Sequence, residues 1–88
     1  MDVAYTPMFL RMLKALPKEL QEETIEKIEL FQDLKMHDNL KVHKLKGRLA
    51  GRYSFSIDYR TRAVFQFEKV KTKKTAILLA IGDHEVYR

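Results

Sequence analysis

The hydrophobic pattern of the chain changes its period near the middle, and this change limits the possible folds more than any other feature. Before residue 40, apolar side chains recur every three or four residues, the spacing of helices that bury one face. After residue 52 they alternate with polar ones or form a continuous run, as strands do. The sequence therefore predicts helices that cover a sheet, which is an α+β fold.

Two prolines divide the helical half. A short strand is predicted over residues 2–6, and Thr6 followed by Pro7 then indicates an N-cap with proline at the first helical position. Pro17 disfavours helical backbone at the residue before it, so the first helix should end there. A second helix is predicted from residue 18 to about residue 35, which makes an αα-hairpin.

The second half predicts three strands. Residues 53–57 and 62–68 alternate apolar with polar side chains, and residues 58–60 are the predicted hairpin turn. Residues 69–74 are predicted to be a charged loop, and residues 75–81 a buried strand rich in apolar side chains. An N-terminal strand and the α-helical hairpin would then pack on one face of an antiparallel sheet of three or four strands.

Strand parity assigns the two faces of this sheet. Arg52, Arg62, Gly82 and His84 are predicted to project from the open face, although one bulge would reverse part of this assignment. The residues predicted to face the helices are Tyr53, Phe55, Ile57, Phe65, Phe67, Ile77, Leu79 and Ile81.

Length and composition narrow the class of protein. The 88 residues fit one domain, residues 1–88, so any site must share its elements with the only core. No apolar run approaches the roughly 18 residues of a membrane span, and no basic segment precedes a long apolar stretch near Met1. The absence of cysteine excludes thiolate chemistry and suits a reducing compartment. We expect a cytoplasmic protein with no membrane partner.

Positive charge is concentrated in the second half. Residues 1–40 hold five Lys or Arg and eight Asp or Glu, a net charge of −3, whereas residues 41–88 hold twelve and four, a net charge of +8. Such asymmetry is typical of a surface for a polyanion, because Lys and Arg displace counterions from phosphates. A merely solvated basic surface is the alternative.

The segment from Lys41 to Arg52 is the densest group of candidate functional residues. Its Lys and Arg side chains lie among His43 and two glycines, Gly47 and Gly51, which let backbone approach a phosphate closely. A phosphate cradle is therefore plausible. The same glycines argue against a continuous DNA-reading helix.

The three histidines differ in their surroundings. His37 follows the second predicted helix and is read as a solvated residue favoured by the helix dipole. His43 lies among cations and His84 on the predicted open face, where an imidazole can serve acid–base catalysis, although both could be ordinary surface histidines. No HExxH motif or cysteine ligand accompanies them, so no metal and no other cofactor is predicted.

A series of short motifs extends over essentially the whole chain. They are Tyr5-Thr-Pro-x-Phe9, Leu16-Pro17, Leu40-Lys-x-His43-Lys-Leu-Lys46-Gly47-x-Leu-x-Gly51, Tyr53-Ser-Phe-Ser-Ile57, Arg62-Ala-Val-Phe65 and Ile81-Gly82-x-His84-x-x-Tyr87-Arg88. Their order and spacing resemble the RelE/ParE superfamily of toxins from type II toxin–antitoxin pairs. The likeness is to the RelE, YoeB and YafQ branches, which cut messenger RNA.

This resemblance implies a fold and an activity. The family fold is two helices on a curved antiparallel sheet, with the active site on the concave side. The implied activity is that of a metal-independent endoribonuclease, an mRNA interferase, in which a 2′-hydroxyl attacks the adjacent phosphate. Such chemistry needs a base, an acid and cations around the phosphate.

The resemblance also implies roles for single residues. His43 would be the general base, Arg62 would contact the scissile phosphate, and His84 would be the general acid. Tyr87 would orient substrate or stack on a base, but it lies three residues beyond His84 rather than next to it as in YoeB, so the acid could be either. The cations expected to bind RNA phosphates are Lys44, Lys46, Arg48 and Arg52.

Partners follow from the same resemblance. A cognate antitoxin would mask the basic surface, and messenger RNA on the ribosome would be the substrate. Two other functions stay open at this point. A ParE-like inhibitor of DNA gyrase shares the fold without an RNase site, and a nonenzymatic RNA-binding module would use the charge alone.

Overall fold

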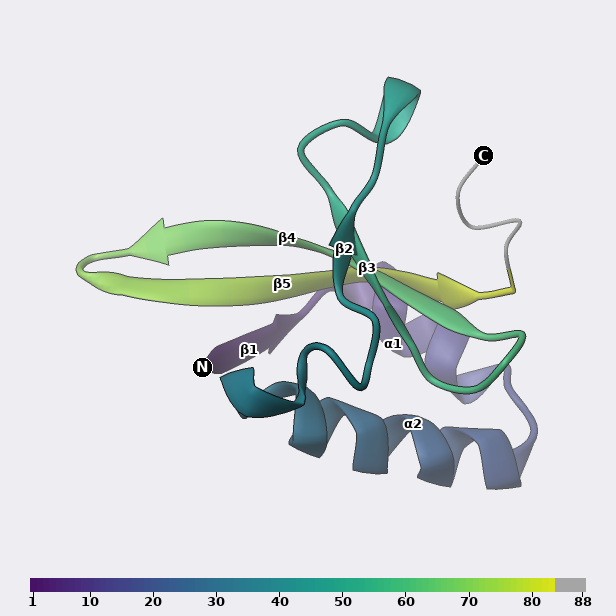
Figure 1. Ribbon diagram of the computed structural model, residues 1–88. Coiled ribbons are helices and arrows are strands. Elements are labelled where there is room, and N and C mark those ends of the chain that lie inside the picture. The colour runs from purple at the N-terminus through teal and green to yellow at the C-terminus, as the bar shows by residue number, and fades with distance from the viewer. Residues whose placement is uncertain (84–88) are drawn as a thin grey trace.

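The computed structural model describes residues 1–83 and shows helices packed against one five-stranded sheet (Figure 1). The helices are α1 (Pro7–Lys14), α2 (Lys18–Phe31) and the short 3-10 helices η1 (Leu34–Met36) and η2 (Gly47–Leu49). The strands are β1 (Asp2–Tyr5), β2 (His43–Lys44), β3 (Tyr53–Ser56), β4 (Arg62–Val70) and β5 (Lys73–Gly82). Within residues 1–83, no helix is long and apolar enough to cross a membrane. The predicted α+β class is confirmed.

The core lies between the helices and one face of the sheet. Phe9 of α1 and Phe31 of α2 share one buried cluster with Phe55 and Phe65 of the sheet. The rings of Phe31 and Phe55 stack with centroids 4.3 Å apart, and Phe65 meets Phe31 edge-on at 4.8 Å. Such aromatic pairs add to the free energy gained by burying their area.

Local hydrogen bonds mark the start of α1 and the end of α2. The Thr6 hydroxyl accepts a hydrogen bond from the Phe9 N–H at 3.1 Å, which confirms the predicted N-cap of α1. α2 ends at Phe31, earlier than predicted. His37 lies beyond this end, where its Nε2 bonds the Phe31 carbonyl oxygen at 2.8 Å and its ring stacks on the Phe31 ring. The predicted place of His37 at the C-terminal end of α2 is confirmed, but its ring is half-buried rather than solvated.

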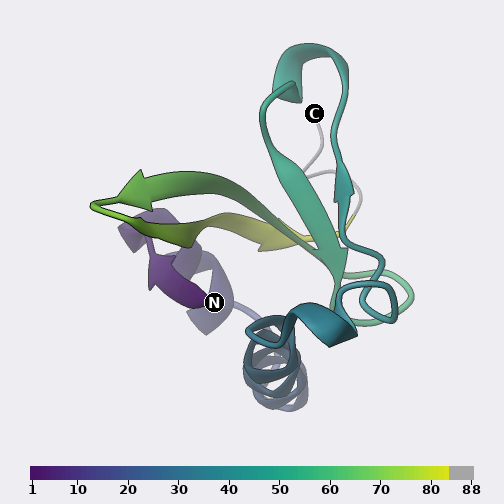
Figure 2. The ribbon, with the colours of Figure 1, turned by 60° about the vertical axis from the view of Figure 1, so that its left-hand side comes forward.

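The strand order is β1-β5-β4-β3-β2, with β1 parallel to β5 and the other pairs antiparallel. The predicted antiparallel sheet is confirmed for the four strands β2 to β5, and the N-terminal strand β1 joins it as a fifth, parallel strand, which makes the whole sheet mixed. A hydrophobic pattern reports which face a strand buries but carries no information about the direction of its neighbour. Figure 2 shows β2 and β3 rising away from the long β4–β5 hairpin, which gives the sheet its strong twist.

The β4–β5 hairpin is longer than predicted. Its strands continue to Val70 and from Lys73, so the expected loop over residues 69–74 is reduced to Lys71 and Thr72. Lys71 has a φ of 60°, the left-handed conformation that such tight turns require. Charged side chains on the exposed ends of two strands resembled a loop in the sequence.

A β-bulge interrupts the pairing of β4 with β5. Val64 lies opposite Ala80, but the next residue, Phe65, lies opposite Leu78. Leu79 is thus an extra residue on β5, and strand parity reverses there.

Two residues of the predicted core lie outside the core in the structure, next to the bulge. Ile77 and Leu79 are only half-buried, whereas Ala76 and Leu78 are fully buried, so the assignment of Ile77 and Leu79 to the helix-facing side is wrong. Ile81, beyond the bulge, is buried as predicted. The other predicted core residues all join or contact the buried cluster; they are Tyr53, Phe55, Ile57, Phe65 and Phe67.

Candidate functional site

A cross-strand row of residues marks the face of the sheet that is turned away from the core cluster. His43 lies opposite Ser54, Ser54 opposite Val64, and Val64 opposite Ala80. Directly opposite residues share a face of a sheet, so His43 belongs to the same face as Val64 and Ala80. We call this the His43 face.

Two arginines lie on either side of this row. Arg52 directly precedes β3, two residues before Ser54, and Arg62 is the first residue of the antiparallel β4, two residues before Val64. The rise of a strand places each Cα about 7 Å from the row, in opposite directions. His43, Arg52 and Arg62 therefore belong to one face of the sheet, as strand parity predicted for the two arginines.

The imidazole of His43 is exposed, and a main-chain carbonyl orients it. Nδ1 lies 2.8 Å from the carbonyl oxygen of Lys41. A carbonyl only accepts, so this bond requires the hydrogen on Nδ1 and leaves the lone pair of a neutral imidazole on Nε2. Lys41 itself has a φ of 58°, a left-handed conformation that is uncommon for a residue with a side chain. Its strained backbone thus directs the bond that sets the tautomer of His43.

The guanidinium of Arg62 is held by the turn between β3 and β4. Nη1 donates to the carbonyl oxygens of Asp58 at 2.7 Å and Thr61 at 3.1 Å, and Nη2 donates to that of Tyr59 at 3.3 Å. These contacts use three of the five N–H donors of the group. The planar side chain is therefore fixed before any ligand arrives.

Asp58 closes the turn that holds Arg62. Its carboxylate accepts from the backbone N–H groups of Arg60 at 2.9 Å and Thr61 at 2.6 Å. Burial tends to raise the pKa of this carboxyl, but the hydrogen bonds from Arg60 and Thr61 and the charge of Arg62 outweigh it, so the pKa lies below its ordinary value. The sequence did predict this turn, but the supporting role of Asp58 was missed. An Asp three residues before a Thr is a signal of an Asx-type turn that could have revealed it.

The remaining predicted phosphate-binding residues occupy the segment around η2. Lys46 and Arg48 are exposed, and the chain there turns through Gly47 at φ 69° and Gly51 at φ 91°. Lys44 is exposed too, but it lies opposite Tyr53 and therefore on the other side of β2 from His43. The structure thus groups Lys46 and Arg48 in one loop and separates Lys44 from the His43 face.

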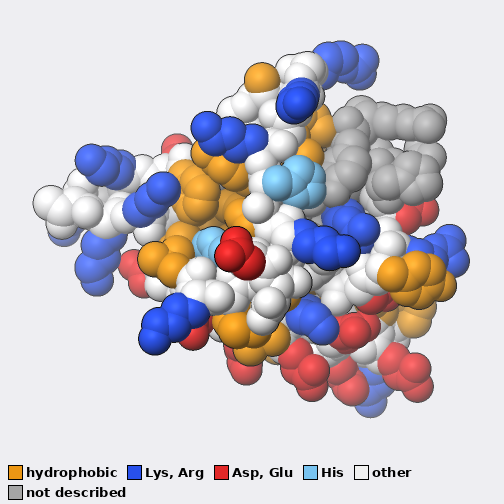
Figure 3. Space-filling view, viewed as in Figure 1, with side chains coloured by type: hydrophobic (Ala, Val, Ile, Leu, Met, Phe, Trp, Pro, Cys, Tyr) orange, Lys and Arg blue, Asp and Glu red, His pale blue; other side chains and the backbone are white. Residues whose placement is uncertain are grey.

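Charge is divided between the two sides of the molecule. Figure 3 shows acidic side chains gathered over α2 in the lower part of the view and basic ones spread over the strands and the loop above. The outer surface of α2 carries exposed Glu22, Glu26 and Glu29. The polyanion-binding surface predicted from the sequence would therefore be the strand and loop side.

His84 and Tyr87 lie outside the described residues. The last described strand position is Gly82, which pairs with Arg62. Within residues 1–83, no three His, Cys, Asp or Glu side chains are grouped as metal ligands would be.

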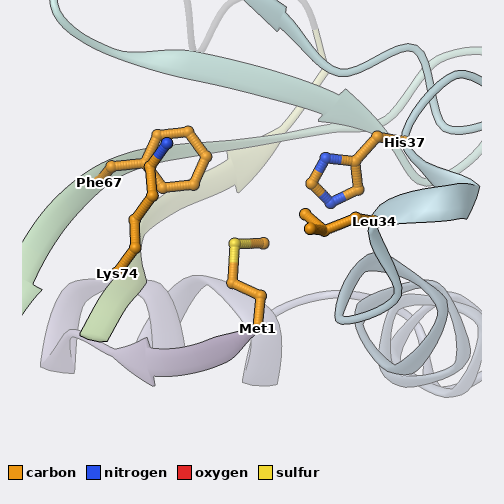
Figure 4. A pocket seen from close by; sticks show the side chains of 5 residues that line it. All are labelled: Met1, Leu34, His37, Phe67 and Lys74. Atoms are coloured by element: carbon orange, nitrogen blue, oxygen red, sulfur yellow. The ribbon is translucent and has the colours of Figure 1, made fainter. Parts of the chain in front are cut away.

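A second, mostly apolar hollow contains none of the predicted site residues. Figure 4 shows Met1 between the ring of His37 and the Phe67–Lys74 pair, in which the Lys74 ammonium lies 4.1 Å from the centre of the Phe67 ring. Leu34 closes this hollow and is 67% exposed. The two titratable side chains of this hollow already have partners, since His37 bonds the Phe31 carbonyl and Lys74 lies over the Phe67 ring.

No protein-family model matches the sequence, and no curated protein matches it either. Solved structures do match over nearly the whole chain. A YoeB/ParE toxin from Agrobacterium tumefaciens is 17% identical with a TM-score of 0.73, over 96% of this chain and 99% of that one. The toxin–antitoxin complex RelBE2 from Mycobacterium tuberculosis is 23% identical with a TM-score of 0.72, over 94% and 96%.

YafQ from E. coli is 13% identical with a TM-score of 0.74, over 97% of this chain and 94% of that one. The resemblance inferred from the motifs is confirmed at the level of the fold. The two helices, the mixed sheet and their order along the chain identify this protein as one with the fold of the RelE, YoeB and YafQ toxins.

Proposed function

We propose that this protein is the toxin of a type II toxin–antitoxin pair and acts as an endoribonuclease that cleaves messenger RNA on the ribosome. The observation that carries the proposal is the orientation of His43. Its Nδ1–H is engaged by the Lys41 carbonyl, so Nε2 is the basic nitrogen of an exposed imidazole that shares its face of the sheet with two arginines. A gyrase-binding surface has no need of such an arrangement.

The reaction uses the RNA as its own nucleophile. Nε2 of His43 takes the proton of a 2′-hydroxyl, whose oxygen attacks the adjacent 3′-phosphate. The bond to the 5′-oxygen of the next nucleotide breaks, which leaves a 2′,3′-cyclic phosphate on one product and a 5′-hydroxyl on the other. His84 donates the proton to that leaving oxygen, with Tyr87 as the alternative donor.

Cations stabilise the phosphate during this step. The donors of Arg62 that the turn does not engage face the crowded phosphate, where negative charge increases in the transition state. Because its carbonyl contacts already orient the guanidinium, little reorganisation is needed when RNA binds. Lys46, Arg48 and Arg52 hold flanking phosphates.

Solved toxin–antitoxin complexes of the same fold support an antitoxin partner. The partner expected here is an acidic protein, partly disordered when alone, that folds across the strand and loop side and covers His43. Its binding would exclude RNA by occupying the basic surface.

The decisive experiment is primer extension on messenger RNA in a purified translation system. Wild-type protein should create new 5′ ends, and His43→Ala and Arg62→Ala should abolish them while circular dichroism shows an unchanged fold. Arg11→Ala, which removes an exposed arginine from α1, is the matched control and should cut like the wild type.

The opposite result has a definite meaning. If wild-type protein leaves RNA intact yet still arrests growing cells, the ParE-like function is favoured, and inhibition of gyrase supercoiling should then be measured. Intact RNA and normal growth would leave only a nonenzymatic binding module.

A further inference from the structure

A small hollow lies at the end of the His43 row. Its volume is about 330 Å³. It is lined by Thr6, Met8, Arg52, Val64, Leu79 and Ala80.

The hollow exists because β1 is short. β1 ends at Tyr5, which lies opposite Leu78, and the Thr6 N–H then donates to the Leu78 carbonyl oxygen at 3.2 Å as the chain turns into α1. Beyond Leu78, β5 therefore has no strand on that side. The start of α1, with Thr6 and Met8, forms a wall there instead.

The β-bulge supplies the second wall. Leu79 is the extra residue on β5, and it lines the hollow instead of joining the core cluster. Bulges commonly redirect a side chain next to a functional site. Here the redirected side chain is apolar, on the face of the sheet that also carries His43 and two arginines.

The lining suits a nucleobase rather than a phosphate. Val64, 2% exposed, and Ala80 form an apolar floor, and Met8 is 55% exposed at the rim. A phosphate gains nothing from apolar surface and loses hydration against it. A nucleobase presents apolar faces, which stack on arginine guanidinium planes, and a thioether contacts aromatic rings favourably. Arg52 is the cation at this hollow, and its guanidinium can stack on a base through its plane while its N–H edge still donates to a flanking phosphate.

We infer that this hollow binds an unpaired nucleobase of the RNA, next to the nucleotide whose 2′-hydroxyl faces His43. The inference rests on the proposed function for the identity of the polymer. Ala80 lies three strands from His43, which is about 14 Å at the usual strand spacing. A neighbouring nucleotide can span that distance, so the hollow would read a base adjacent to the cut.

A titration of methyl signals by NMR tests this without any cleavage. The probes are 2′-O-methylated trinucleotides of uridine or adenosine, which cannot be cut because the attacking hydroxyl is blocked. Signals from the methyl groups of Thr6, Met8, Leu79 and Ala80 should shift on binding, whereas those of Ile25 and Leu30 on α2 should not.

Three variants test the roles of stacking, charge and the space in the hollow. Arg52→Lys keeps the positive charge but loses the planar face, so the affinity for the trinucleotide should fall about fivefold or more. Arg11→Lys makes the same exchange at an exposed position of α1 that does not line the hollow, and it should change affinity less than twofold. Ala80→Leu fills the hollow and should remove the methyl shifts of Met8 while a signal of His43 still responds.

The outcomes distinguish the two proposals. If the trinucleotides shift His43 but no methyl of the hollow, or bind nowhere, the base site is wrong. Equal affinities for Arg52→Lys and wild type would also overturn it. If the methyl groups respond but the wild type never cuts messenger RNA, the base site stands and the proposed RNase function fails.

Discussion

The two central side chains of the candidate site are oriented by backbone carbonyls. His43 bonds the carbonyl of Lys41, and Arg62 bonds three carbonyls of one turn. A motif in a sequence can name His43 and Arg62, but it cannot show these partners, because every residue has a carbonyl. Their use depends on backbone conformations, such as φ 58° at Lys41, that the side-chain pattern does not encode.

The first prediction at this scale concerns His43. His43→Ala should lower the cleavage rate about a hundredfold or more, because it removes the proposed base and leaves in place the cations that are proposed to bind RNA. Added imidazole should restore part of the rate, since it can occupy the vacated space and accept the proton. The rate is measured on messenger RNA in a translation system. Arg11→Ala should show no dependence on imidazole, and a His43→Ala rate equal to that of wild type would contradict the base assignment.

The second prediction concerns Asp58, which positions Arg62 through the turn. Asp58→Ala removes the acceptor of two backbone N–H groups and should destabilise the fold by about 1–2 kcal/mol, measured by urea unfolding. Asp58→Asn keeps an acceptor oxygen and should recover much of the cleavage rate. A rate that is lost equally in both variants would argue that the charge of Asp58, and not the turn, matters.

The lowered pKa of Asp58 adds a pH dependence. The folded carboxyl has a lower pKa than the ordinary 3.8 of the unfolded chain, so its stabilising effect is complete above that value. The effect is lost as the pH falls through the lower folded pKa. The difference in unfolding free energy between wild type and Asp58→Asn should therefore shrink in acid and be constant near neutrality.

At the scale of elements, the helices and the β3–β4 hairpin could be predicted because local signals specify them. Proline, an N-cap threonine and the Asp58 turn each act within a few residues. The parallel pairing of β1 with β5 and the bulge at Leu79 depend on contacts between distant segments. The short strand β2, which holds His43, has too few residues to show any period. The position of His43 in the sheet therefore could not be predicted from the sequence and is known only from the structure.

The third prediction concerns the turn of the β4–β5 hairpin. Lys71 has a φ of 60°, which strains a residue with a Cβ but not glycine. Lys71→Gly should therefore stabilise the protein by about 0.5–1 kcal/mol. Thermal unfolding should show a midpoint that is higher by a few degrees. Thr72→Gly is the matched control, because Thr72 is not among the residues with positive φ, and it should lower the midpoint. A lower midpoint for Lys71→Gly would show that the turn has another conformation.

At the scale of the whole molecule, acidic and basic side chains gather on different sides of the protein, which makes its electrostatic field asymmetric. The acidic outer surface of α2 and the basic strand and loop side would orient it toward a polyanion with His43 leading. An acidic antitoxin would compete for that same side. Net charge along the sequence showed the asymmetry, but only the fold shows that the basic half of the chain forms one side and α2 another.

The last prediction follows from this separation. Affinity for an uncleavable single-stranded RNA should fall as salt rises, because each cation that contacts a phosphate releases counterions. Lys46→Ala and Arg48→Ala, in the loop around η2, should each reduce the slope of log affinity against log salt by about 0.7. Lys18→Ala, at the exposed start of α2, should leave that slope unchanged. Fluorescence anisotropy at several potassium chloride concentrations measures all four proteins. Equal slopes for every variant would mean that RNA does not contact the η2 loop, and the phosphate-binding roles of Lys46 and Arg48 would then be wrong even if cleavage by His43 is established.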